Sequence, residues 1–269
     1  MTRSMHATLG RAANAFFNAP LEAYASAVGR QDAEAPLAPS GRAVTEALRE
    51  MSRTPKALDR PVVVLGGYRS WPFLASRLRD RLIALTSGEA TDIVAISYTL
   101  RSRFDDAASI AMDRLRSWRT DVADATTEVD IVGISMGGLV ARALLAGNDG
   151  PRSARVFTLA TPHRGARLAE RIAPDDAARA MVPDSPTLQR LDHAWMSRSY
   201  ELIPYAVLDD HWVGASRTAP AGVDPLWTSG PPLISHLSMS ALPGVIADIA
   251  RRLRGEQPLA KAPSPPPRE

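Results

Sequence analysis

A serine flanked by glycines lies between two apolar stretches in residues 129–145, VDIVGISMGGLVARALL. The pentapeptide GISMG has the G-x-S-x-G pattern of a nucleophile on a tight strand-to-helix turn. Glycine on both sides of Ser135 removes Cβ atoms that would collide in such a turn. The turn would expose Ser135 Oγ at the end of a strand, facing the positive N-terminus of a helix. The alternative is a plain strand-to-helix turn, but we predict that Ser135 is a nucleophile.

A serine hydroxyl is a weak nucleophile and needs a base, usually a histidine oriented by a carboxylate. Around such a turn the chain order is serine, acid, histidine. Of the five histidines, His236 is best placed, in a predicted loop between the last predicted strand and the last predicted helix. His211 follows the nucleophile too closely to leave room for an acid-bearing strand end, and His193 lies in a polar stretch typical of a helix surface. The alternative for His236 is capping of the final helix.

Two adjacent aspartates, Asp209 and Asp210, follow the apolar stretch IPYAVL. Neighbouring side chains at a strand end point in opposite directions, so only one of the two is expected to reach an imidazole. Either carboxylate could instead cap the loop. The residues alone therefore leave the choice of acid open.

Apolar segments alternate with amphipathic ones from residue 60 onward. Strands are predicted within 61–68, 91–98, 129–134, 154–161 and 203–209, and helices at 71–85, 107–122, from 136, and at 242–253. Strands that are apolar throughout, separated by helices, predict an α/β fold whose mostly parallel sheet has helices on both faces. Functional groups in such sheets gather at the carboxyl ends of the strands.

The expected domain organisation has three parts. Residues 1–59 are predicted to be a helical extension and linker, 60–254 the main domain, and 255–269 a disordered Pro-rich tail. Residues 164–202, between two predicted strands, are too long for a simple crossover and are the candidate for a helical cap or lid. The alternative is one helix packed on the sheet with a long loop.

Composition excludes several classes of function. The net charge is +3, but the arginines are spread among acidic residues rather than clustered with aromatics, so no nucleic-acid partner is expected. The absence of cysteine excludes disulfides and thiolate metal sites. Without a P-loop, dinucleotide fingerprint or HExxH, neither cofactor nor metal is expected.

No stretch reaches the ~18–20 apolar residues of a membrane span, and polar residues interrupt the Ala-rich N-terminus. A cytoplasmic protein is therefore expected. The N-terminal helix or the lid would offer any peripheral membrane contact, and the oligomeric state stays open.

The chain resembles the α/β-hydrolase superfamily, and within it the bacterial lipases and esterases. The matching segments, covering about residues 60–253, are VVVLGGYRS, VDIVGISMGGLVAR, TLATPHRGARLA, MVPDSPTLQRL, LDDHWVGAS and SHLSM. By this resemblance Ser135 matches the nucleophile and His236 the base. Asp210 matches the acid, because the family's acid commonly precedes a valine by three positions, as Asp210 precedes Val213.

The resemblance also implies an oxyanion hole made by the backbone N–H groups of Tyr68 and Met136. The family's first loop usually reads His-Gly, whereas this chain has Gly66-Gly67, which leaves the backbone donors in place but alters the loop. His163, in TPHRG, matches a motif residue of structural character.

The implied function is a serine carboxylic-ester hydrolase that acts on a small-molecule or lipid ester with an apolar acyl group, through an acyl-enzyme. Two alternatives stay open. An acyltransferase or thioesterase would use the same residues, and a non-catalytic binding protein would use only the hydrolase scaffold.

Overall fold

The computed structural model describes residues 34–70, 72–87, 89–98, 102–122, 128–147, 149–231 and 234–267. Within these parts of the chain, six strands form a parallel sheet in the order β2-β1-β3-β4-β5-β6. The strands are β1 (Val62–Leu65), β2 (Ile93–Ile96), β3 (Val129–Ile134), β4 (Ser153–Leu159), β5 (Glu201–Val207) and β6 (Leu226–Thr228). The predicted fold class, an α/β fold built on a parallel sheet, is confirmed.

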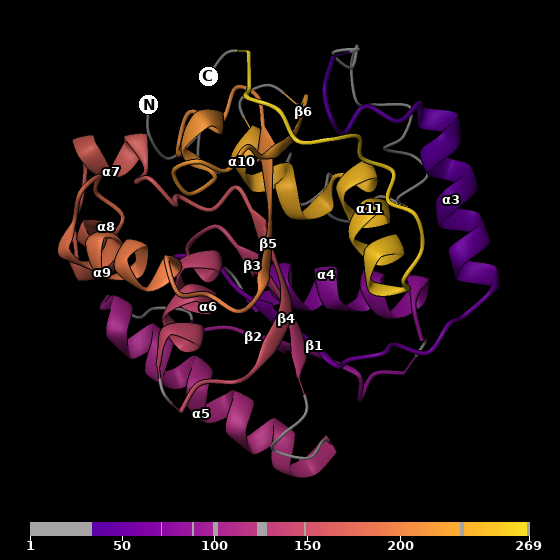
Figure 1. Cartoon of the computed structure of the whole chain (residues 1–269), viewed down its shortest axis with the longest axis horizontal. Helices are drawn as coiled ribbons and strands as arrows, with labels where there is room; N and C mark the ends of the chain where they lie inside the picture. Colours follow the sequence, from indigo (N-terminus) through magenta and orange to yellow (C-terminus); the bar gives the residue numbers. More distant parts are fainter. Residues whose placement is uncertain are drawn as a thin grey trace, which may run out of the picture.

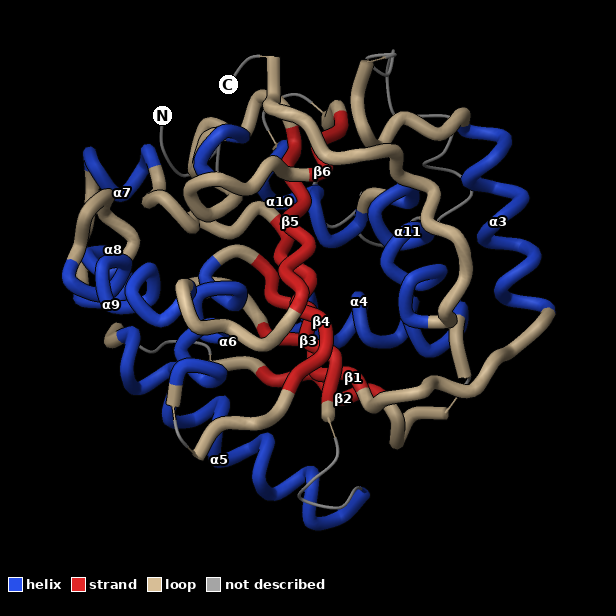
Figure 2. The backbone as a smooth tube through the Cα atoms, viewed as in Figure 1, coloured by secondary structure: helices blue, strands red, loops and turns tan. Residues whose placement is uncertain are grey.

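Helices cover both faces of the sheet, which appears as a column of red strands in Figure 2. One face carries α3 (Gly41–Arg53), α4 (Pro72–Leu85) and α11 (Pro243–Leu253); the other carries α5 (Phe104–Val122), α6 (Met136–Ala146), α8 (Asp176–Ala180) and α9 (Pro186–Trp195). Figure 1 shows α7 (Arg167–Arg171) grouped with α8 and α9 on the α6 side. β1 is apolar throughout, and β3 is apolar apart from the buried Asp130, because neither face of the sheet meets water.

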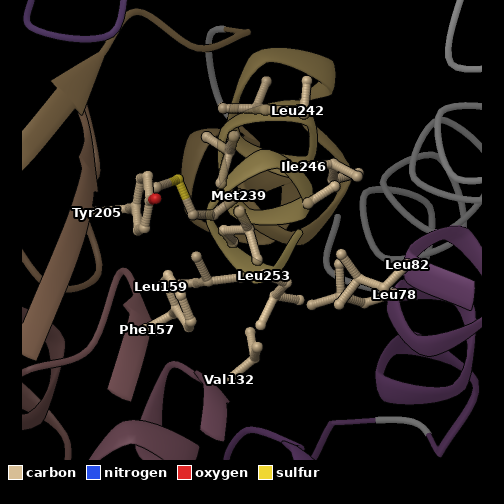
Figure 3. Close-up of a cluster of buried hydrophobic side chains, with 14 of the residues drawn as sticks. Leu78, Leu82, Val132, Phe157, Leu159, Tyr205, Met239, Leu242, Ile246 and Leu253 are labelled. Atoms are coloured by element: carbon tan, nitrogen blue, oxygen red, sulfur yellow. The ribbon is translucent and has the colours of Figure 1, made fainter. Parts of the chain in front are cut away.

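The core on the α11 side joins the sheet to two helices (Figure 3). Ile246 and Leu253 of α11 lie between Phe157 of the sheet and Leu78 of α4, and all four are buried. Full burial of one such side chain stabilises the fold by ~1.5–3 kcal/mol. This packing holds α11 against this face of the sheet and against α4.

Part of the predicted N-terminal extension packs into this same core. Val44 and Met51 of α3 are buried in the cluster that contains Ile246, and so is Leu37, in the predicted linker. The Leu37 N–H also donates to the Trp227 carbonyl at 3.2 Å. Residues 34–53 therefore belong structurally with the main domain, whereas the helix predicted within residues 1–30 lies outside the described residues.

The Pro-rich tail also differs from the disordered segment that composition predicted. The carboxylate of Asp248 on α11 is fully buried and accepts hydrogen bonds from the backbone N–H groups of Leu259 (2.6 Å) and Ala260 (2.8 Å). The Lys261 N–H donates to the Pro36 carbonyl at 2.8 Å. A buried carboxylate needs such donors, so the tail lies along α11.

Two short elements near the candidate site were not predicted. β6 has three residues, too few for a periodic pattern to stand out. The expected loop around His236 contains α10 (Ser235–Ser238), followed by the 3₁₀ turn η2 (Met239–Ala241). In the described part of the chain, no helix is long and apolar enough to cross a membrane.

Candidate active site

Ser135 occupies the turn between β3 and α6 with φ 52° and ψ −122°. This positive φ is unusual for a residue with a side chain and needs support from its surroundings. A Cβ on Gly133 would lie 2.5 Å from Gly138 Cα, and one on Gly137 would lie 2.5 Å from the Leu65 carbonyl oxygen. Both glycines are therefore required for the turn, as the G-x-S-x-G pattern predicts.

Two backbone contacts hold the strained serine in place. Its N–H donates to the Leu159 carbonyl at 2.8 Å, and its own carbonyl accepts from Thr161 Oγ1 at 2.8 Å. These bonds fix the residue through its main chain and leave the hydroxyl available for other contacts. The position of the hydroxyl therefore depends on how the fold holds the main chain of Ser135, as well as on the side-chain rotamer.

The structure brings Ser135, His236 and Asp210 together from distant parts of the chain. His236 Nε2 lies 3.1 Å from Ser135 Oγ, and His236 Nδ1 lies 2.8 Å from Asp210 Oδ2. Both distances are hydrogen-bond distances. The imidazole can therefore accept the serine proton at Nε2 while its Nδ1–H donates to the carboxylate.

Asp210 is fully buried, and its second oxygen is used as well. Oδ1 accepts from the N–H groups of Trp212 and Val213, both at 3.0 Å. Burial by itself would raise the pKa of Asp210, but His236 and the two N–H donors lower it below the ordinary value. The bond from Val213 gives a physical reason for an Asp-x-x-Val spacing, because it closes a turn that points the carboxylate inward. Asp209 precedes this turn with φ 59°.

Trp212, which the sequence reasoning did not single out, stacks on the imidazole. The ring centroids of Trp212 and His236 are 5.0 Å apart, with an interplanar angle of 27°. The indole shields one face of the base while its side chain remains 43% exposed. Its place two residues after the proposed acid was the available signal.

The loop after β1 lies directly beside the serine. A Cβ on Gly67 would be 3.3 Å from Ser135 Cβ and 3.2 Å from the Ile134 carbonyl oxygen. Tyr68 is the next residue, and Met136 is the first residue of α6, whose N–H has no partner within the helix. Of the two residues expected to supply oxyanion donors, Met136 thus follows Ser135 in the chain, and Tyr68 follows Gly67, which lies beside Ser135.

His163 is fully buried and contacts two other polar side chains. Arg142 Nη1 lies 3.2 Å from its Nδ1, and Thr158 Oγ1 lies 3.1 Å from its Nε2. Because a guanidinium can only donate, Nδ1 must accept and Nε2 must carry the proton. The structural character expected for His163 fits this position. His193 and His211 are exposed.

The stability of the protein should depend on pH through His163. Burial, and then the charge of Arg142, hold the pKa of His163 well below its usual value. Below about pH 6.5 the unfolded chain takes up a proton that the folded imidazole refuses, so the free energy of unfolding falls by up to about 1.4 kcal/mol per pH unit. Chemical denaturation of wild type and His163→Gln at about pH 7.5 and about pH 5 measures this difference. The wild type should lose more stability than the variant, and equal losses would contradict the assignment.

The candidate lid, residues 164–202, forms α7, α8 and α9. α8 and α9 pack on the α5–α6 side, and Arg142 of α6 donates to the Leu191 carbonyl at 2.8 Å. α7 lies next to the site, because the Leu168 N–H donates to the Trp212 carbonyl at 2.9 Å. Leu168 on α7 is 41% exposed, and Ile172, directly after α7, is 64% exposed. The chain around α7 therefore exposes apolar side chains, and its main chain is bonded to Trp212, the residue that stacks on the imidazole. Whether it moves as a lid stays a prediction.

Across the residues that the structure describes, there is no cluster of three or more His, Cys, Asp or Glu side chains that could hold a metal ion. The polar groups beside Ser135 are a base, a carboxylate and backbone donors. This arrangement can activate a hydroxyl and stabilise an oxyanion.

A sequence model of the family described as "Alpha/beta hydrolase family" matches residues 62–264. No curated protein sequence matches the chain significantly.

Solved structures with a similar backbone include two forms of the Bacillus licheniformis lipase BlEst2. The mature form is 15% identical with a TM-score of 0.54, covering 70% of this chain and 89% of the lipase. The propeptide form is also 15% identical, with a TM-score of 0.56, covering 78% of this chain and 54% of the lipase. At this identity the likeness shows the fold.

A third match is the Legionella pneumophila phospholipase PlaB in complex with thio-NAD. It is 15% identical with a TM-score of 0.47, covering 55% of this chain. The matched region spans only 37% of the phospholipase's length.

Proposed function

Because the chain belongs to the alpha/beta hydrolase family, we propose that it is a serine carboxylic-ester hydrolase, similar to lipases and esterases, acting on an apolar acyl ester. The observation that carries this proposal is the hydrogen-bonded series from Ser135 Oγ to His236 (3.1 Å) and from His236 to Asp210 (2.8 Å). A buried acid, a base and a serine on a strained turn together form the set that acyl transfer requires.

In the first half of the reaction, His236 Nε2 accepts the proton of Ser135 Oγ while Oγ attacks the ester carbonyl carbon. The carbonyl oxygen becomes an oxyanion, bound by the N–H groups of Met136 and Tyr68. His236 then gives its proton to the departing alkoxide, which leaves as an alcohol. An acyl group remains on Ser135.

In the second half, water replaces the alcohol. His236 takes a proton from the water as it attacks the acyl carbon, and returns that proton to Ser135 Oγ when the carboxylic acid leaves. Asp210 stabilises the imidazolium in both halves, because its carboxylate accepts from Nδ1–H and remains ionised. The N-terminus of α6 adds a positive partial charge at the oxyanion.

The preference for an apolar acyl group is supported by the side chains around the site. Trp212 lies against the imidazole, and its carbonyl accepts the N–H of Leu168, an exposed apolar residue of α7. Ile172, also exposed, directly follows α7. Burying such surface against an acyl chain would contribute ~25 cal/mol per Å². A charged acyl group would gain nothing there.

Hydrolysis of p-nitrophenyl esters with acyl chains of graded length tests this proposal. We expect kcat/KM to rise as the acyl chain lengthens from two carbons, with release of one p-nitrophenol per carboxylic acid. Adding a primary alcohol distinguishes hydrolysis from acyl transfer, because a transferase would form a new ester in place of the acid. No turnover of any oxygen ester or thioester would contradict the proposal and favour a binding protein on the same scaffold.

A further inference from the structure

We propose that Asp175, at the N-terminus of α8, is a positioning residue that fixes the oxyanion loop 66–70 beside Ser135. It does so by binding the side chains of Tyr68 and Arg69. This inference rests on the proposed function, because it concerns the Tyr68 N–H as an oxyanion donor.

One carboxylate oxygen of Asp175 receives both loop side chains. Tyr68 Oη donates to Oδ2 at 2.8 Å, and Arg69 Nη2 donates to the same oxygen at 2.7 Å. The other oxygen, Oδ1, accepts the Ala178 N–H at 2.9 Å and so caps α8. Asp175 thus links two consecutive loop residues to the start of a helix more than a hundred positions away in the chain.

The protonation states make these bonds strong and directional. Partial burial alone would raise the pKa of Asp175, but the bonds from Ala178, Tyr68 and Arg69 lower it, so the carboxylate is ionised. Burial, and then the bond to Asp175, raise the pKa of Tyr68 to about 12, so its hydroxyl stays protonated and donates. Asp175 is also only 10% exposed. Charge-assisted bonds to a shielded carboxylate are stronger than those between neutral groups.

The loop needs this support because it is strained and must be placed accurately. Arg69 has φ 48°, a left-handed conformation that is unfavourable for a residue with a side chain. On the inner side, the loop is held by Ser70 Oγ, which accepts the Gly67 N–H at 3.0 Å, and by Tyr98 Oη, which donates to the Gly66 carbonyl. Asp175 holds the outer side of the loop through Tyr68, whose backbone N–H is the proposed oxyanion donor, and through Arg69. An error of about 1 Å in such a group can lower the rate about 100-fold.

Two substitutions separate this role from capping of α8. Asp175→Ser keeps a side-chain oxygen for the Ala178 N–H but is too short to bind Tyr68 and Arg69, and Tyr68→Phe removes only one hydroxyl. We expect Asp175→Ser to lower kcat by about 10- to 100-fold with KM changed less than about threefold, since the oxyanion forms after substrate binding. Tyr68→Phe should lower kcat less, because Arg69 still binds Asp175.

The double variant tests whether the two residues act together. Asp175→Ser/Tyr68→Phe should be no slower than Asp175→Ser alone, because the same bond is lost in both. A trifluoromethyl ketone, which forms a tetrahedral adduct with the serine, should bind each variant more weakly by the factor lost in kcat/KM. Asp176→Ala is the matched control, because Asp176 is the adjacent exposed aspartate, 4.0 Å from Arg179, and should leave kcat within about twofold.

The outcomes distinguish the two proposals. An inert wild type would overturn both. An active wild type whose kcat is unchanged in folded Asp175→Ser would overturn only the role of Asp175, and so would a raised KM with normal kcat, or additive effects in the double variant. If Asp175→Ser does not fold, Tyr68→Phe decides alone: normal kcat and normal ketone affinity would contradict the inference.

Discussion

Replacing Ser135 by alanine is expected to lower ester turnover by about 10⁶-fold, the loss seen when the serine or the histidine of a serine triad is removed. The substitution removes the attacking oxygen and leaves His236 and Asp210 without a reaction to assist. It should not disturb the turn, because the contacts that hold residue 135 are made by its main chain to Leu159 and Thr161. Turnover of one p-nitrophenyl ester, measured with wild type and variant at equal concentration, gives the result.

The control for this experiment is a serine far from the site. Ser52, near the end of α3, donates its hydroxyl to the Arg49 carbonyl at 3.0 Å, and Ser52→Ala should retain full turnover. Thermal unfolding of both variants should match wild type. A Ser135→Ala protein that is folded and still active would mean that the site lies elsewhere.

Asp210→Asn is expected to lower turnover by about 10⁴-fold, the cost of the same change in the best-studied triad. The carboxylate uses Oδ2 for His236 and Oδ1 for the N–H groups of Trp212 and Val213. An asparagine amide has one acceptor oxygen and one NH₂ group. The NH₂ group must therefore face either the imidazole or the two backbone N–H groups. If the NH₂ group faces the imidazole, Nδ1 must accept a hydrogen bond, so the proton lies on Nε2. Nε2 can then no longer accept the serine proton.

The matched control is the neighbouring residue. Asp209→Asn makes the same chemical change one position earlier, and we expect a loss of tenfold or less. Circular dichroism and thermal unfolding of both variants would show whether each is folded. A folded Asp209→Asn protein that is the more impaired of the two would move the acid to Asp209.

The elements nearest the proposed nucleophile could be predicted because local sterics determine their sequence. The turn at Ser135 tolerates only glycine at 133 and 137, and this requirement appears directly as G-x-S-x-G. The Asp210–Val213 spacing is likewise local, since the Val213 main-chain N–H donates to the Asp210 carboxylate three residues earlier. The order of serine, acid and histidine followed from the family resemblance and from strand order, and the structure places all three within hydrogen-bond distance.

Other features depend on contacts between distant segments and left no local pattern. The tail composition predicted disorder, yet the N–H groups of Leu259 and Ala260 donate to a buried carboxylate on α11. No pattern in the tail sequence indicates this contact. The contact of Tyr68 with Asp175 joins residues 107 positions apart. Such pairs are set by how the helices beyond β4 pack, which hydrophobic periodicity in one segment does not specify.

The central claim is that Ser135 is the nucleophile, and mapping a covalent adduct tests it most directly. The intact chain is incubated with a fluorophosphonate, digested, and sequenced by mass spectrometry, with Ser135→Ala and His236→Ala treated in parallel. We predict one phosphonyl group per chain, located on Ser135, absent from Ser135→Ala and formed much more slowly in His236→Ala because the base is missing. An adduct on another residue, or ester hydrolysis by a chain that takes up no phosphonate, would contradict the mechanism.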